Sequence, residues 1–76
     1  MRLCDGEPGN TYEVSAIRLA MQMERRLEAL GLTPGGSIQI LGKKPRGAMI
    51  VKFRGSRFAL GRSMTEKIFI QRRAAE

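Results

Sequence analysis

Apolar and polar residues alternate along five short stretches of the chain, and this pattern predicts β-strands. The stretches are 11–17, 37–41, 48–53, 56–60 and 67–71. Arg54 and Gly55 separate the third stretch from the fourth, which predicts a tight hairpin. The side chains expected to face a common core are Tyr12, Val14, Ala16, Ile38, Ile40, Met49, Val51, Phe53, Phe58, Leu60, Ile68 and Ile70.

The spacing of the apolar residues changes between the first and second predicted strands, where they recur every three or four positions. Ala20, Met23, Leu27 and Leu30 share one face of a helix at this spacing. We therefore expect a helix of about three turns that packs Met23, Leu27 and Leu30 onto the sheet.

Two glycine signals follow this helix directly. Gly31 occupies the position where a helix commonly ends on a left-handed residue, and Leu32 can then fold back onto the last turn. Pro34 and Gly35 suit the central positions of a type II turn, which needs a positive φ at its second central residue. The stretch is predicted to stop a helix and reverse the chain into the next strand.

The segment Ser63-Met64-Thr65-Glu66 has the spacing of a capping box, which predicts a short helical turn before the last strand. The final RRAAE is expected to fray. Five strands with one inserted helix bury the most apolar surface if the sheet curls. We therefore predict one mostly β domain over residues 1–76, a small and partly open five-stranded barrel.

Charge and cysteine content narrow the class of protein. The formal net charge is +7, which favours acidic partners such as nucleic acid, anionic lipid or an acidic protein surface. Cys4 is the only cysteine, which suits a reducing compartment, and the N-terminus lacks the apolar run of a signal peptide. No stretch approaches the length that spans a bilayer. We expect a cytoplasmic protein that does not insert into membranes.

The chain resembles the ferrous iron transport protein A family, FeoA. The residues that carry the resemblance include Gly9, Tyr12, Val14, Ile17, Ile38, Gly47 and Ile68 and, above all, the run RRLEALGLTPG from Arg25. The resemblance implies an SH3-like barrel that docks on FeoB, a membrane ferrous iron transporter with a cytosolic G-protein domain, and modulates its transport or GTP hydrolysis. A domain with a similar sequence pattern forms the C-terminal end of iron-dependent repressors. Here no DNA-binding helix-turn-helix precedes it, so a stand-alone relative of that repressor domain is kept as an alternative.

The residue types argue against an enzyme. The chain has no histidine, and its seven acidic residues are scattered, so neither a nucleophilic triad nor a paired-carboxylate site is apparent. Glu24 with Glu28, and Cys4 with Asp5 and Glu7, are weak metal candidates without histidine, and the methionines are better explained as core residues. We predict no cofactor. Whether a metal binds, especially between subunits, and whether the chain forms a homo-oligomer are left open.

Two surfaces are predicted to bind a protein partner. Arg25, Arg26, Leu32 and Pro34 form an apolar edge flanked by arginines, although Leu32 also has the simpler role of closing the helix end. Lys43, Lys44 and Arg46 form a charged loop that would steer the domain toward an acidic surface, unless it is only a solvated hairpin tip. Nucleic-acid binding by a small basic barrel is the competing function, but the four aromatic residues mostly occupy expected core positions.

Overall fold

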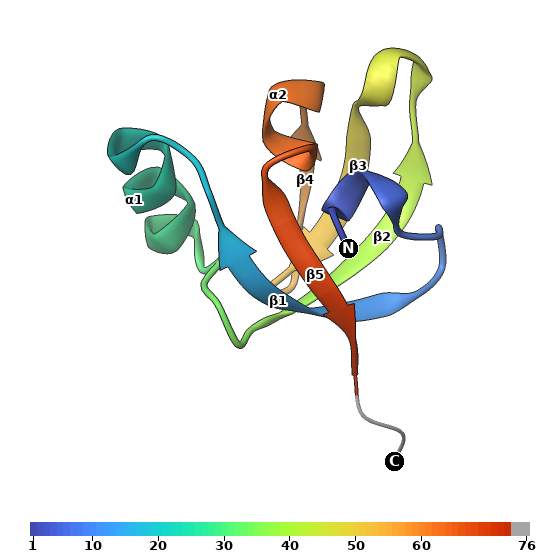
Figure 1. Ribbon diagram of the computed structural model, residues 1–76. Helices are drawn as coiled ribbons and strands as arrows, with labels where there is room; N and C mark the ends of the chain where they lie inside the picture. Colours follow the sequence, from blue (N-terminus) through green and yellow to red (C-terminus); the bar gives the residue numbers. More distant parts are fainter. Residues whose placement is uncertain (74–76) are drawn as a thin grey trace.

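The computed structural model describes residues 1–73 and is built on one antiparallel sheet of five strands in the order β4-β3-β2-β1-β5 (Figure 1). The sheet curls into a small SH3-like barrel, and α1 is inserted between β1 and β2, as the sequence predicted. The elements in chain order are η1 (Leu3–Asp5), β1 (Thr11–Ile17), α1 (Met21–Leu30), β2 (Ser37–Lys43), η2 (Pro45–Gly47), β3 (Met49–Phe53), β4 (Ser56–Leu60), α2 (Arg62–Thr65) and β5 (Ile68–Arg72).

The core lies inside the curled sheet and is formed by the side chains that alternation predicted. Ile38, Ile40, Val51, Ile68 and Ile70 are all fully buried. The predicted hairpin joins β3 to β4, with Arg54 and Gly55 both at positive φ. Phe58 is only half-buried, and its ring stacks on that of Phe53 with 4.3 Å between centroids.

Two β-bulges modify the alternation in a way that the pattern did not predict. One lies between Val14 and Ala16 in β1, and the other lies between Ile40 and Gly42 in β2. A bulge adds one residue to one strand and so turns the following side chains to the other face. Ile17 therefore faces the core with 8% of its surface exposed, whereas Ala16 is only half-buried.

The N-terminal segment covers the free edge of β5. The Met1 ammonium group donates to the Ile70 carbonyl at 2.9 Å, and the Ile70 N–H donates to the Met1 carbonyl at 2.7 Å. Leu3 of η1 is fully buried, a core position that the sequence pattern did not indicate. β5 itself continues to Arg72, which pairs with Tyr12, so the predicted fraying from Arg72 is wrong, and residues 74–76 of that tail lie outside the described residues.

The capping box predicted from Ser63 to Glu66 is wrong, because the N-cap of α2 lies two residues before Ser63. Its N-cap is Gly61, and no side chain caps it. The turn is held instead by the Thr65 hydroxyl, which donates to the Gly47 carbonyl at 2.9 Å, and by a 2.8 Å ion pair between Arg62 and Glu66. The Thr65 hydrogen bond ties α2 to η2, whereas the ion pair lies within the α2 turn itself.

Candidate protein-docking surfaces

α1 ends in a Schellman motif, which confirms the predicted role of Gly31. Gly31 has φ +105°, and its N–H donates to the Glu28 carbonyl at 2.9 Å. The Leu32 N–H donates to the Leu27 carbonyl at 2.9 Å, so the chain folds back over the last turn. Leu27 and Leu32 are 2% and 1% exposed, and both belong to the hydrophobic core. This pair anchors the end of the helix.

Two neighbouring leucines differ in how they match their predictions. Of the two roles predicted for Leu32, the structure shows the one that closes the helix end, since the C-terminal motif turns it back toward Leu27 and buries it away from any docking edge. Leu30 was predicted to lie in the core but is 45% exposed. Leu30 lies about 60° from Leu27 around the helix axis. The face of the helix that packs on the barrel is therefore too narrow to bury both Leu27 and Leu30.

The turn after the helix forms as predicted and is bonded to the sheet. The Gly36 N–H donates to the Thr33 carbonyl at 3.0 Å, and Gly35 has φ +91°, as a type II turn requires. The Gly35 N–H also donates to the Val14 carbonyl at 2.7 Å. Pro34 is exposed at the tip of this turn. The structural role predicted for Gly35 is thus consistent with its geometry.

The exposed side of α1 carries apolar and basic side chains together. Met21 is 65% exposed, and it lies one turn before the exposed Arg25. Leu30 lies one turn after the exposed Arg26. Figure 1 shows α1 standing at one side of the barrel. We call Met21, Arg25, Arg26 and Leu30 the α1 surface.

The β3–β4 hairpin supports α1 from below its C-terminal end. A Cβ atom built on Gly31 would lie 2.5 Å from Cγ of Arg54, so the stem of Arg54 rests directly on the Gly31 backbone. A cation in this position also interacts favourably with the C-terminal end of the helix dipole. Gly31 is therefore required both for its positive φ and for the close approach of Arg54.

The second predicted docking surface is separate from the first. Lys43, Lys44 and Arg46 are all exposed, on the end of β2 and on η2. Figure 1 places η2 and α1 on different sides of the barrel. The connection is tight, since the Lys44 N–H donates to the Ala48 carbonyl at 2.8 Å and Arg46 adopts φ +69°. The structure does not bring the two groups of predicted residues together.

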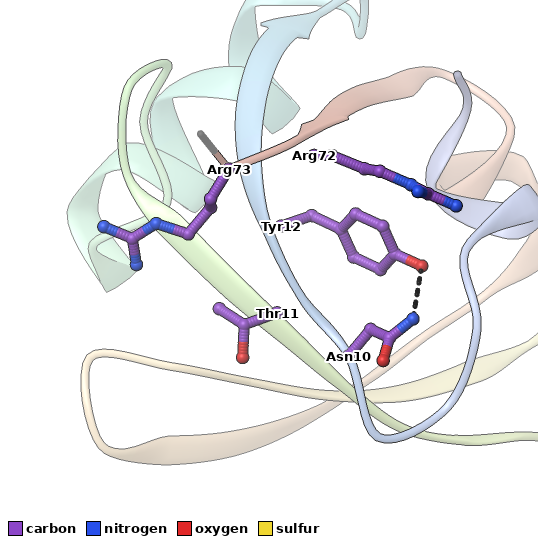
Figure 2. Close-up of a pocket in the computed structure, with 5 residues that line it drawn as sticks. All are labelled: Asn10, Thr11, Tyr12, Arg72 and Arg73. Carbon is purple, nitrogen blue, oxygen red and sulfur yellow. Dashed lines mark hydrogen bonds between the residues drawn. The ribbon is translucent and has the colours of Figure 1, made fainter. Parts of the chain in front are cut away.

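A third polar surface, on the outside of the sheet, was not predicted from the sequence. Two shallow hollows share Thr11. The larger, about 340 Å³, is lined by Asn10, Thr11, Tyr12, Arg72 and Arg73 (Figure 2). The smaller, about 210 Å³, is lined by Thr11, Ser37, Gln39, Lys52, Phe53, Arg54 and Gly55. The outward positions of alternating strands could have indicated these residues, but their grouping depends on strand order.

The larger hollow has an ordered polar wall. The Tyr12 hydroxyl accepts hydrogen bonds from the Glu7 N–H at 2.9 Å and from Asn10 Nδ2 at 3.3 Å (Figure 2). The Tyr12 ring itself is buried. Arg72 lies along the same side as this ring, whereas Arg73 turns away and donates to the Ser37 hydroxyl at 2.7 Å. The hollow therefore presents guanidinium groups and no exposed aromatic face.

The hydrogen bond from Arg62 lowers the pKa of the Glu66 carboxyl, and this ion pair is solvent-exposed. Within residues 1–73, no three Cys, Asp or Glu side chains gather in a way that could hold a metal ion. In the same part of the chain, no helix has the length and apolar character needed to cross a membrane.

Comparison with known proteins identifies the family. The model of the FeoA domain matches residues 1–72. The chain belongs to the FeoA family. An iron uptake regulatory protein (FeoA) is 31% identical, with a TM-score of 0.82 and coverage of 93% of this chain and 95% of that one. No curated protein matches the chain.

Two further structures place the fold in context. A FeoA of Stenotrophomonas maltophilia, solved with zinc and described as an SH3 domain protein, is 26% identical, with a TM-score of 0.77 over 97% of this chain and 99% of that one. A manganese-dependent transcriptional repressor is 22% identical, with a TM-score of 0.82 over 93% of this chain and 35% of that one. The repressor shares the fold alone. FeoA membership indicates an accessory role in ferrous iron transport.

Proposed function

We propose that this FeoA-family protein is a cytoplasmic accessory of ferrous iron uptake that docks on the membrane ferrous iron transporter, FeoB, and modulates its transport or GTP hydrolysis. The observation that carries the proposal is the exposure of Met21 and Leu30 beside two arginines on α1. A family with an accessory role in transport needs a contact with its transporter, and this helix offers the best candidate surface.

The composition of the α1 surface suits protein recognition. Interface cores are enriched in methionine and arginine, because both supply contact area and arginine adds charge and a planar donor group. The helix is held at its C-terminal end by Leu27, Leu32 and the Schellman motif. The exposed face is therefore positioned without being used by the fold. Pro34, also predicted to contact the partner, is exposed in the turn that follows the helix.

Lys43, Lys44 and Arg46 form a second and weaker contact in this proposal. These cations would accelerate the approach to an acidic region of the transporter, and their contribution would decline with salt. Because they lie away from α1, docking through both surfaces requires a partner that wraps around the barrel or two partner segments.

The test is binding of the purified protein to the cytosolic domain of the transporter, measured by calorimetry, together with GTP hydrolysis by that domain. The double variant Arg25→Ala/Arg26→Ala should weaken binding by about tenfold or more while its thermal melt stays close to wild type. The matched control, Arg18→Ala/Lys67→Ala, removes two exposed cations elsewhere and should bind like wild type.

The proposal fails in two ways. If neither the cytosolic domain nor the full transporter binds, and hydrolysis and iron uptake do not change, the chain does not act on the transporter. If binding occurs but both double variants lose it equally, the contact is general charge attraction and α1 is not the docking element.

A further inference from the structure

The outer face of the barrel carries a row of polar and basic side chains that follows the strand register across β4, β3, β2 and β1 and ends at Arg73, directly after β5. All are exposed except Gln39, which is half-buried. Strand register pairs Thr11 with Gln39, Gln39 with Lys52, and Lys52 with Arg57. Because Tyr12 pairs with Arg72, the next residue, Arg73, lies beside Thr11. At about 4.8 Å between neighbouring strands, the row is about 19 Å long when measured along the curved sheet. We call Arg73, Thr11, Gln39, Lys52 and Arg57 the basic row.

Lys52 and Arg57 face each other directly across β3 and β4. Like charges in this arrangement repel each other and destabilise a sheet. The ion pairs among residues 1–73 are Arg2 with Asp5 and Arg62 with Glu66, so no acidic partner compensates this repulsion in the described part of the chain. An anion bound between the two side chains would remove the cost.

The surroundings of the row favour carboxylates over nucleic-acid bases. Both hollows include residues of the row, and the smaller one adds Arg54 and the Ser37 hydroxyl as further donors. Tyr12 and Phe53, the aromatic residues that line these hollows, are each 3% exposed, so neither ring is free to stack on a base. Glu13, on the neighbouring row, already accepts a hydrogen bond from Gln71 at 3.3 Å.

From this geometry we propose that the basic row binds an extended, acidic segment of a partner protein. Arginine forks and the lysine ammonium pair with the partner's carboxylates, while Thr11 and Gln39 between them hydrogen-bond its backbone. About six extended residues span the length of the row. This surface is distinct from the α1 surface, and the inference does not depend on the transporter proposal.

The first test measures binding of a fluorescein-labelled hexaglutamate peptide by fluorescence anisotropy across a salt series, with hexaglutamine as the neutral probe. Hexaglutamate should bind in low salt and weaken as salt screens the contacts, whereas hexaglutamine should not bind. Lys52→Gln/Arg57→Gln should raise Kd by about three- to tenfold. The control Arg18→Gln/Lys67→Gln lowers net charge equally and should change Kd by less than about twofold.

A single charge reversal separates binding from structure. Arg57→Glu places opposite charges across the strands, so its melting temperature should rise above wild type while hexaglutamate binding is lost. A side chain with only a structural role would not raise stability and abolish binding together.

Three results overturn the proposal. If both double variants weaken hexaglutamate binding equally, the peptide is attracted by net charge alone. Equal binding of hexaglutamine means that carboxylates are not recognised. Tighter binding of a labelled single-stranded oligonucleotide, lost in Lys52→Gln/Arg57→Gln, means that the row is a nucleic-acid surface instead.

Discussion

α1 and α2 both connect strands of the same barrel, but they are attached to it in different ways. α1 has ten residues and one fully buried side chain, Leu27. α2 has four residues, yet Thr65 is fully buried and bonded to Gly47, and Arg62 pairs with Glu66. The longer helix is fixed mainly at its C-terminal end and leaves its outer face exposed. The shorter one is bonded to η2 through Thr65 and also contacts η1, so it is held against the barrel.

The difference shows that a chain of 76 residues uses its two helical segments unequally to stabilise the barrel. Helical stability in proteins comes mostly from tertiary packing of one face. The residues of α2 contact η1 and η2. α1 packs on the barrel mainly through one leucine and its C-terminal motif. Substitutions in the two helices should therefore have separable effects.

The largest effect is expected at Leu27, the buried side chain within α1. Leu27→Ala should lower the free energy of unfolding by about 2–5 kcal/mol, because it removes a buried side chain and leaves a cavity. Leu30→Ala, the same change three residues later in the same helix, should cost less than about 0.5 kcal/mol because Leu30 is exposed. Urea unfolding of both variants measures the difference. Equal costs would mean that α1 packs on the barrel over a wider face.

Thr65 provides the corresponding test in α2. Thr65→Val should cost about 1–3 kcal/mol, because it removes the hydroxyl that donates to the Gly47 carbonyl and leaves that carbonyl without this bond. Thr65→Ser keeps the hydroxyl and should recover most of the loss. Ser63→Ala should be close to neutral in the same thermal melts. A large cost at Ser63 would restore the capping box that the structure does not contain.

The C-terminal end of α1 should be somewhat less sensitive. Gly31→Ala should cost about 1–2 kcal/mol, because an L-residue is strained at φ +105° and its Cβ would displace Arg54. Gly42→Ala is the matched control, since Gly42 lacks a positive φ and a Cβ there meets no atom within 4 Å. If the two variants melt at the same temperature, the left-handed stop does not determine how α1 is held.

These sites also show how far the sequence predicts the fold. Alternation identified the five strands and their inward residues, because burial of one sheet face imposes a period of two. It missed the bulges in β1 and β2, since the strand partner decides where an extra residue is accommodated. It also missed Leu3, whose burial depends on the N-terminal segment pairing with β5.

The candidate surfaces were predicted less completely, for a related reason. Arg25 and Arg26 are exposed as expected, but Leu30 is exposed where burial was predicted, and Leu32 closes the helix end and is not available at a docking edge. Helical spacing alone does not show how much of the α1 surface packs on the barrel. It also does not show in which direction the chain turns after a left-handed residue. The basic row was not visible in the sequence, because Thr11, Lys52 and Arg73 become neighbours only through strand order.

The smallest effect concerns charge at the end of α2. The hydrogen bond from Arg62 lowers the folded-state pKa of Glu66 below its ordinary value of 4.5. A lowered carboxyl pKa adds stability that is present above the unfolded-state value and is lost as pH falls through the folded one. Glu66→Gln should therefore melt slightly below wild type at pH 7, and the melting temperatures of the two proteins should converge in acid.

Glu28→Gln, on the exposed side of α1, controls for loss of one negative charge. Because the ion pair is exposed, high salt should shrink the Glu66 difference. A difference in melting temperature that persists in acid would mean that Glu66 stabilises α2 by packing and not through its ion pair with Arg62. α2 would then be held by packing, as α1 is.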